Sequence, residues 1–116
     1  MDVDQILAIR DHDDALIIEV LPRSLDEQST RLLTDGVLTH AADRTGVPVV
    51  LDLSNVTFAP SVALGALVQM SKSFKLDGRR AAMINVSKRV MAAIRVTQLH
   101  KVLELHRTLD DVLRSK

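Results

Sequence analysis

The chain has 116 residues, 47% of them hydrophobic, which fits a single domain over residues 1–116 with a real core. It has no net charge, no cysteine and two aromatic residues. These features argue against a basic nucleic-acid-binding module, a zinc-thiolate site and a base-stacking surface. No apolar run approaches the length of a membrane span, so we expect a cytoplasmic protein without membrane insertion or direct nucleic-acid binding.

The first elements predicted are a hairpin and a helix. Residues 3–10 and 15–21 have the pattern of two short strands that flank a polar turn. A helix fits residues 26–44, where apolar residues recur at helical spacing. Ser24 or Asp26 can cap this helix by accepting hydrogen bonds from the free amides of its first turn.

A buried strand and a second helix follow. The apolar run at 49–53, broken only by Asp52, is typical of a strand that is buried on both faces. A helix fits residues 62–77, with Ser61 as its expected cap. Gly65 lies inside this helix, where glycine costs about 1 kcal/mol relative to alanine, so we expect close packing at that position.

The remaining sequence predicts a strand at 80–85, a helix at 88–97, a strand at 102–105 and a final helix capped by Thr108. The predicted order is therefore ββαβαβαβα. Strands that alternate with helices imply a mixed, mostly parallel central sheet covered by helices, which is an α/β fold.

Charge is divided unevenly along the chain. Residues 1–60 carry a net charge of −7 and residues 61–116 a net charge of +7. One interpretation is that the two halves interleave in space, so that the charges largely cancel. The other is a basic face in the second half that meets an acidic partner or an anionic ligand. The residues of that face would be Lys72, Lys75, Arg79, Arg80, Lys88, Arg89 and Arg95.

The sequence offers little for catalysis. His12, His40, His100 and His106 are scattered, and we expect them to lie on the surface or in loops rather than to bind a metal. Asp52 is the best candidate acid, because ligands of open α/β sheets bind beyond the carboxyl ends of the strands. The alternative is a strand-end carboxylate bonded to loop amides. We therefore expect no enzyme, no catalytic residue, no metal and no cofactor. An enzyme or small-ligand carrier that uses Asp52 and the basic second half remains a weaker hypothesis.

The stretch at 51–65 places Ser61 at the start of a helix. The first helix amides lack internal partners, and the helix dipole adds about half a positive charge there. A phosphorylated serine would be stabilised at such a position, so Ser61 suits a phosphorylation switch. The simpler interpretation is that Ser61 only caps the helix.

The same stretch resembles the signature of STAS domains, and specifically of the anti-sigma factor antagonists (anti-anti-sigma factors) of bacteria, approximately D-L-S-x-V-x-F-x-D-S-S-G-L-G. The matching positions are Asp52, Leu53, Ser54, Val56, Phe58, Ser61, Leu64 and Gly65. The family's early G-x-L-D element is similar to residues 23–26 without its glycine, and the chain end is similar to the family's usual ending. The resemblance covers about residues 4–114.

The resemblance implies a small α/β domain that regulates transcription indirectly through protein–protein interaction. Its partner would be an anti-sigma factor that is also a serine kinase, with Ser61 as the phosphorylation site of a phosphoprotein. Asp26, Ser61 and Val62 would belong to the partner-binding surface. Homodimerisation stays open.

The sequence departs from the signature beside the acceptor serine, at Pro60, Val62 and Ala63. These changes remove an acidic group, a hydroxyl and a flexible glycine. They leave open an alternative function, a STAS scaffold or subunit of another complex that is neither phosphorylated nor linked to a sigma factor.

Overall fold

The structure is a computed structural model, and it describes residues 2–115. Its centre is a five-stranded sheet whose strands follow one another in sequence order. The first pair is antiparallel and the other three pairs are parallel, which confirms the predicted mixed, mostly parallel sheet. The strands are β1 (Leu7–His12), β2 (Ala15–Val20), β3 (Val49–Asp52), β4 (Ala81–Ile84) and β5 (Leu105–His106).

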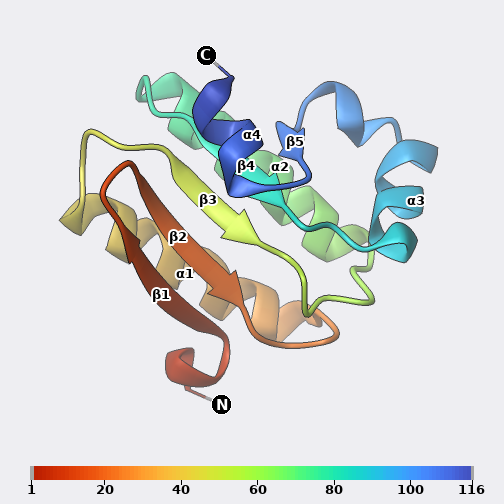
Figure 1. Cartoon of the computed structure of the whole chain (residues 1–116). Coiled ribbons are helices and arrows are strands. Elements are labelled where there is room, and N and C mark those ends of the chain that lie inside the picture. The colour runs from red at the N-terminus through yellow and green to blue at the C-terminus, as the bar shows by residue number, and fades with distance from the viewer. Residues whose placement is uncertain (1, 116) are drawn as a thin grey trace.

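Four α-helices within residues 2–115 cover the sheet, and the order ββαβαβαβα is confirmed. They are α1 (Glu27–Asp43), α2 (Ser61–Leu76), α3 (Lys88–Val96) and α4 (Leu109–Arg114). The main core cluster joins one face of the sheet to α1, α2 and α3. A smaller cluster joins the opposite face to α4, which crosses in front of the sheet in Figure 1.

Strand β3 lies in the middle of the sheet, as its apolar run predicts. All four of its residues are buried, and it pairs with β2 on one side and β4 on the other. Its side chains alternate between the two core clusters, with Leu51 in the main cluster and Val50 in the smaller one. The strand therefore fixes the positions of the loops that leave its two ends.

Several predicted boundaries differ from the structure. Residues Val3–Gln5 form a short 3₁₀ helix, so the first strand begins at Leu7 rather than at residue 3. The predicted strand at 102–105 is wrong in its position. Leu103 is buried beside the 3₁₀ turn Leu99–Lys101, and only Leu105–His106 pairs with β4. The alternation of apolar residues at 102–105 thus combines a buried residue next to the turn, Leu103, with the first residue of β5, Leu105.

The expectation of close packing at Gly65 is wrong. A Cβ atom added at Gly65 would meet nothing within 4 Å. The close approach occurs instead at Gly36 in α1, where an added Cβ would lie 2.6 Å from Cδ2 of Leu7 and 3.1 Å from Cγ2 of Val3. Gly36 thus lets α1 pack against the start of β1.

The two oppositely charged halves of the chain lie side by side and do not interleave. Because the strands follow sequence order, β1, β2, β3 and α1 form one side of the molecule. The elements from α2 to α4 form the other side, as the colour gradient of Figure 1 shows. The charge difference between the halves is therefore a difference between two sides of the molecule.

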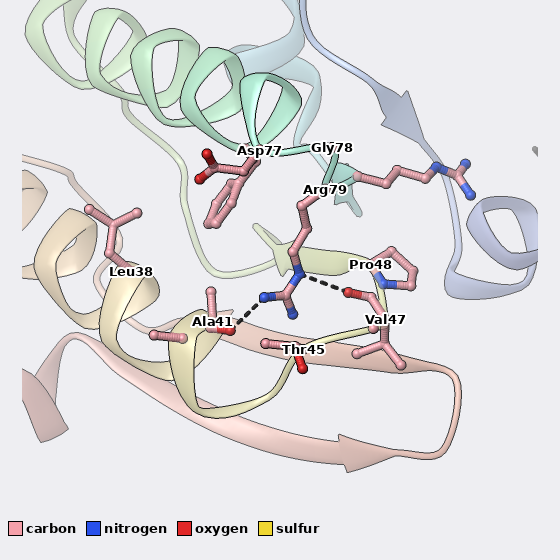
Figure 2. A pocket seen from close by; sticks show the side chains of 12 residues that line it. Leu38, Ala41, Thr45, Val47, Pro48, Asp77, Gly78 and Arg79 are labelled. Atoms are coloured by element: carbon pink, nitrogen blue, oxygen red, sulfur yellow. Dashed lines mark hydrogen bonds between the residues drawn. The ribbon is translucent and has the colours of Figure 1, made fainter.

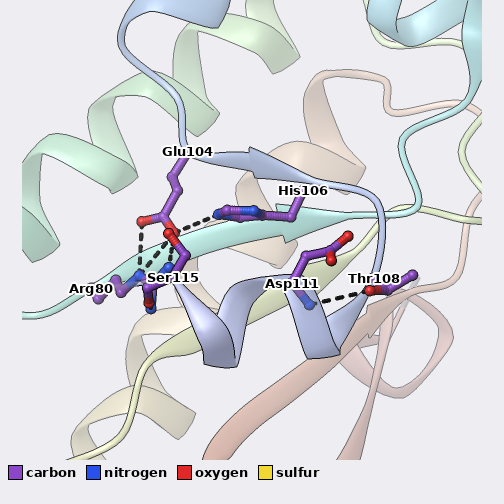
Figure 3. A network of polar contacts seen from close by, with 6 residues as sticks. All are labelled: Arg80, Glu104, His106, Thr108, Asp111 and Ser115. Carbon is purple, nitrogen blue, oxygen red and sulfur yellow. Dashed lines mark hydrogen bonds and ion pairs between the residues drawn. The ribbon is translucent and has the colours of Figure 1, made fainter.

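Two members of the predicted basic face have structural roles. Arg79 reaches into a cavity of about 610 Å³ at the amino-terminal edge of the parallel strands (Figure 2). There its guanidinium donates to the carbonyl oxygens of Val47 (3.0 Å) and Ala41 (2.5 Å). Arg80 pairs with Glu104 and donates to the carbonyl oxygen of Ser115 (Figure 3). These two arginines tie chain segments together, and part of their hydrogen-bonding capacity is used within the fold.

Within residues 2–115, no helix is both long and apolar enough to cross a membrane.

Candidate functional site: the carboxyl edge of the sheet

Two loops meet at the carboxyl edge of the sheet, one after β2 and one after β3. Ser24 and Phe58 form an isolated parallel bridge between them. The carbonyl oxygen of Arg23 accepts hydrogen bonds from the amides of Thr57 (2.7 Å) and Phe58 (3.1 Å). The amide of Leu25 donates in turn to the carbonyl oxygen of Phe58 (3.1 Å). These bonds hold the starts of α1 and α2 at the same edge, where the predicted site residues lie.

Asp26, one of the two caps that the sequence allows, is the N-cap of α1. Its carboxylate accepts from the backbone amide and from the hydroxyl of Ser29, both at 2.7 Å. These hydrogen bonds, the backbone bond first, lower the pKa of Asp26 below its usual value. Asp26 is exposed, so the cap also places a fixed negative charge on this surface.

Ser61 is the first residue of α2 and not its cap, so the capping expectation is wrong. The N-cap is Pro60, which makes no side-chain hydrogen bond to the helix, and α2 begins with the bond from the Leu64 amide to the Pro60 carbonyl oxygen. The sequence suggested Ser61 because serine is a favoured cap. Ser61 is exposed, at the end of the helix where the first amides have no partners within it.

Apolar side chains are exposed around Ser61. Val62 is 59% exposed, and Phe58 in the preceding loop is 48% exposed. The guanidinium of Arg89, in the first turn of α3, lies 5.8 Å from the centre of the Phe58 ring, which is within range of a cation–π interaction. We call Asp26, Phe58, Ser61, Val62 and Arg89 the edge surface.

No pattern in the sequence marks Phe58 and Arg89 as a pair. Phe58 matches the family signature, and this match is a signal that could have marked it. Arg89 appears in the sequence only as one of many basic residues. Its position over the ring depends on how α3 packs against the loop after β3, and no local pattern predicts that packing.

Asp52 lies inside the sheet edge and has several partners. Its Oδ2 atom is 2.5 Å from Nη2 of Arg10, and its Oδ1 atom accepts from the amide of Ser54 (3.0 Å) and from Nδ2 of Asn85 (3.3 Å). Burial raises the pKa of Asp52, but the hydrogen bonds from Ser54 and Asn85 and the charge of Arg10 outweigh it, so the pKa is lowered. Asp52 is thus a strand-end carboxylate bonded to a loop amide, which is the alternative that the sequence offered to a candidate acid.

The four histidines lie on four different elements: His12 on β1, His40 on α1, His100 in the turn Leu99–Lys101 and His106 on β5. Within the described part of the chain, no group of three or more His, Cys, Asp or Glu residues is arranged to hold a metal ion. His106 is on β5, partly buried, with Nε2 2.8 Å from a carboxylate oxygen of Glu104. It is therefore more enclosed than the expected surface or loop position.

Comparison with known proteins gives the family. Residues 7–112 match the STAS domain. An anti-sigma factor antagonist from Mycobacterium paratuberculosis is similar in structure, with 25% identity, 94% of this chain and 91% of that chain covered, and a TM-score of 0.75. A STAS domain protein from Planctomyces limnophilus has 23% identity, 94% and 95% coverage, and a TM-score of 0.74. A Thermotoga maritima protein has 20% identity, 92% and 85% coverage, and a TM-score of 0.80. Since the matched region spans almost all of its length, the chain belongs to the STAS domain family.

Proposed function

We propose that this chain is an anti-sigma factor antagonist, a protein-binding regulator that controls transcription indirectly and does not bind DNA. Its partner would be an anti-sigma factor with serine kinase activity, and phosphorylation of Ser61 would release that partner. The observation that carries this proposal is the exposure of Ser61 between the apolar side chains of Phe58 and Val62. The likeness to the anti-sigma factor antagonist from M. paratuberculosis supports it.

The edge surface, formed by Asp26, Phe58, Ser61, Val62 and Arg89, has the composition of a protein interface. Aromatic and arginine residues are enriched in such interfaces and dominate their energetics, and Phe58 and Arg89 supply one of each in contact. Val62 extends the apolar area onto α2, and Asp26 adds a fixed charge at its border. The loops beneath are joined by main-chain hydrogen bonds, so the surface is held in shape before the partner arrives.

A phosphate on Ser61 would act differently on the fold and on the complex. The fold tolerates it, because the free amides and the dipole of α2 favour negative charge at the helix start. In the complex, up to about two negative charges would be buried beside Phe58 and Val62, and burying an unpaired charge is costly. Phosphorylation thus weakens binding and leaves the domain folded.

The alternative function is a STAS scaffold without a sigma-factor role. It draws on Pro60, Val62 and Ala63, which depart from the family signature beside the acceptor. A scaffold predicts a partner that is not a kinase and a Ser61 that carries no phosphate. Both functions use binding and no catalysis, so an activity assay does not separate them.

Capture of the partner separates the two functions. Wild-type protein and the Ser61→Asp variant are expressed with the same affinity tag in the cell that encodes the chain, and bound proteins are identified by mass spectrometry. Phosphopeptide mapping is carried out on the wild-type protein from that cell. Ser73→Asp is the matched control, because it adds the same charge at an exposed position near the far end of the same helix.

The proposal predicts a kinase-type anti-sigma factor in the wild-type and Ser73→Asp captures and much less of it with Ser61→Asp. It also predicts a phosphate on Ser61. A partner of another class, retained equally by all three proteins, together with an unmodified Ser61, would favour the scaffold.

A further inference from the structure

A hollow lies at the carboxyl edge of the sheet, between the ends of β4 and β5 and helix α3. It has a volume of about 480 Å³, which is within the range of small-molecule sites. Its lining includes residues that directly follow two parallel strands, since Asn85 comes after β4 and Arg107 after β5. Open α/β sheets bind ligands at this edge.

The charge of this hollow is one-sided. Arg95 of α3 and Arg107 line it, and none of the described residues that line it carries a carboxylate. Within residues 2–115 neither guanidinium has a hydrogen-bond or ion-pair partner. By contrast, Arg10 is paired with Asp52 and Arg80 with Glu104. Two arginines whose guanidinium groups have no hydrogen-bond or ion-pair partner among residues 2–115 therefore line one cavity.

The nearby carboxylates are already occupied. Oδ1 of Asp52 accepts from Ser54 and Asn85, and Oδ2 is held by Arg10. Glu104 is bound by Arg80 on one side and by His106 on the other, as Figure 3 shows. These groups leave the positive charge of the hollow uncompensated.

The rest of the lining is apolar or fixed in place. Val86, Met91 and Leu105 give one part of the wall a hydrocarbon surface. Asn85 has a left-handed backbone with φ of 57°, and its amide donates to the carbonyl oxygen of Arg107 (3.3 Å). The ends of β4 and β5 are thus joined by a main-chain bond, which holds the two sides of the hollow together.

We propose that this hollow binds a small organic anion, with its phosphate or carboxylate group between Arg95 and Arg107 and its apolar part on Val86, Met91 and Leu105. Guanidinium groups bind both kinds of oxyanion through paired, charge-assisted hydrogen bonds. The site is separate from Ser61, so the proposal stands whether or not that serine is phosphorylated. It also assigns a role to basic residues of the second half that have no structural partner.

Amide NMR titrations at constant ionic strength test the site with four probes. Phenyl phosphate and benzoate carry the two oxyanions on the same ring, inorganic phosphate lacks the ring, and benzyl alcohol lacks the charge. The variants are Arg95→Gln and Arg107→Gln, neither of which removes a hydrogen bond or an ion pair of a guanidinium group within residues 2–115. Arg114→Gln is the matched control, because Arg114 is exposed on α4 and does not line the hollow.

We expect saturable shifts for one or both ring anions at residues 85–95 and 105–107, with weaker binding of inorganic phosphate and none of benzyl alcohol. Each of the two variants should raise the dissociation constant about tenfold, as expected for the loss of one charged hydrogen-bonding group, and Arg114→Gln should leave it unchanged. The ring anion with the lower dissociation constant identifies the oxyanion that the site prefers. Failure of both to saturate, or equal binding by all four proteins, would overturn the proposal.

Discussion

The guanidinium of Arg10 on β1 lies 2.5 Å from Oδ2 of Asp52 at the end of β3, and therefore reaches across β2. Arg10 is half exposed, whereas the side chain of Asp52 is 5% exposed. The pair joins the edge hairpin to the central strand just before the loop that leads to Ser61. Loss of the carboxylate charge should therefore be felt in the stability of the fold.

We predict that Asp52→Asn destabilises the protein by about 1–3 kcal/mol at neutral pH, because it removes a charged acceptor from Arg10 and Ser54. The folded-state pKa of Asp52 is lowered, so the stabilisation is complete above the ordinary carboxyl pKa and is lost as pH falls through the folded value. The difference between the wild-type protein and the variant should thus shrink below about pH 4. Urea unfolding at neutral and acidic pH measures it, and a constant difference would contradict the role of the charge.

Burial of β3 gives a second prediction. Leu51 is 3% exposed and belongs to the main core cluster, so Leu51→Ala should cost about 2–5 kcal/mol of unfolding free energy. Urea unfolding of the variant provides the measurement. A loss below about 1 kcal/mol would show that the strand is not packed as described.

Two glycines give opposite expectations for the same substitution. Gly65→Ala should stabilise the protein by about 1 kcal/mol, because alanine favours the helix and the added Cβ meets nothing. Gly36→Ala gains the same propensity, but its Cβ would overlap Leu7, and overpacking costs about 1–3 kcal/mol. Thermal unfolding of the two variants side by side compares them. An equal gain in both would refute the close packing of α1 on β1.

The start of α2 makes a prediction that differs from the one the sequence suggests. Ser61→Ala should change the unfolding free energy by less than about 0.5 kcal/mol, because Ser61 is not the helix cap. Ser87→Ala is the matched comparison, since the side chain of Ser87 caps α3 by accepting from the Val90 amide at 3.2 Å. It should cost about 1 kcal/mol. Chemical denaturation of both variants measures the two unfolding free energies. A large loss of unfolding free energy in Ser61→Ala would contradict the prediction.

Local patterns predict much of this fold because they report burial directly. The run at 49–53 predicts β3, and Asp26, Ser87 and Thr108 are caps as their residue types favour. The predictions fail where the path of the backbone, and not the residue type, decides which residue occupies a position. Pro60, with φ of −68° and an extended ψ, occupies the cap position and moves Ser61 into the helix.

Local sequence patterns also do not show which side chains of neighbouring elements come together in the fold. The positions of Ser61 and Asp26 at one edge follow from parallel strands, and so does the expectation of a site there. The contact of Arg89 with Phe58 and the joint lining of a hollow by Arg95 and Arg107 depend on how α3 packs, which no spacing in the sequence encodes.

The most direct test of the account is the affinity of the captured partner for the wild-type protein, Ser61→Asp and Ser73→Asp, measured by isothermal titration calorimetry. We predict that Ser61→Asp weakens binding by tenfold or more, equivalent to about 1.4 kcal/mol, and keeps its melting temperature nearly unchanged. Ser73→Asp should bind as the wild-type protein does, because Ser73 lies near the other end of α2. Equal affinity of all three proteins would contradict the claim that the surface around Ser61 is the switchable partner-binding site.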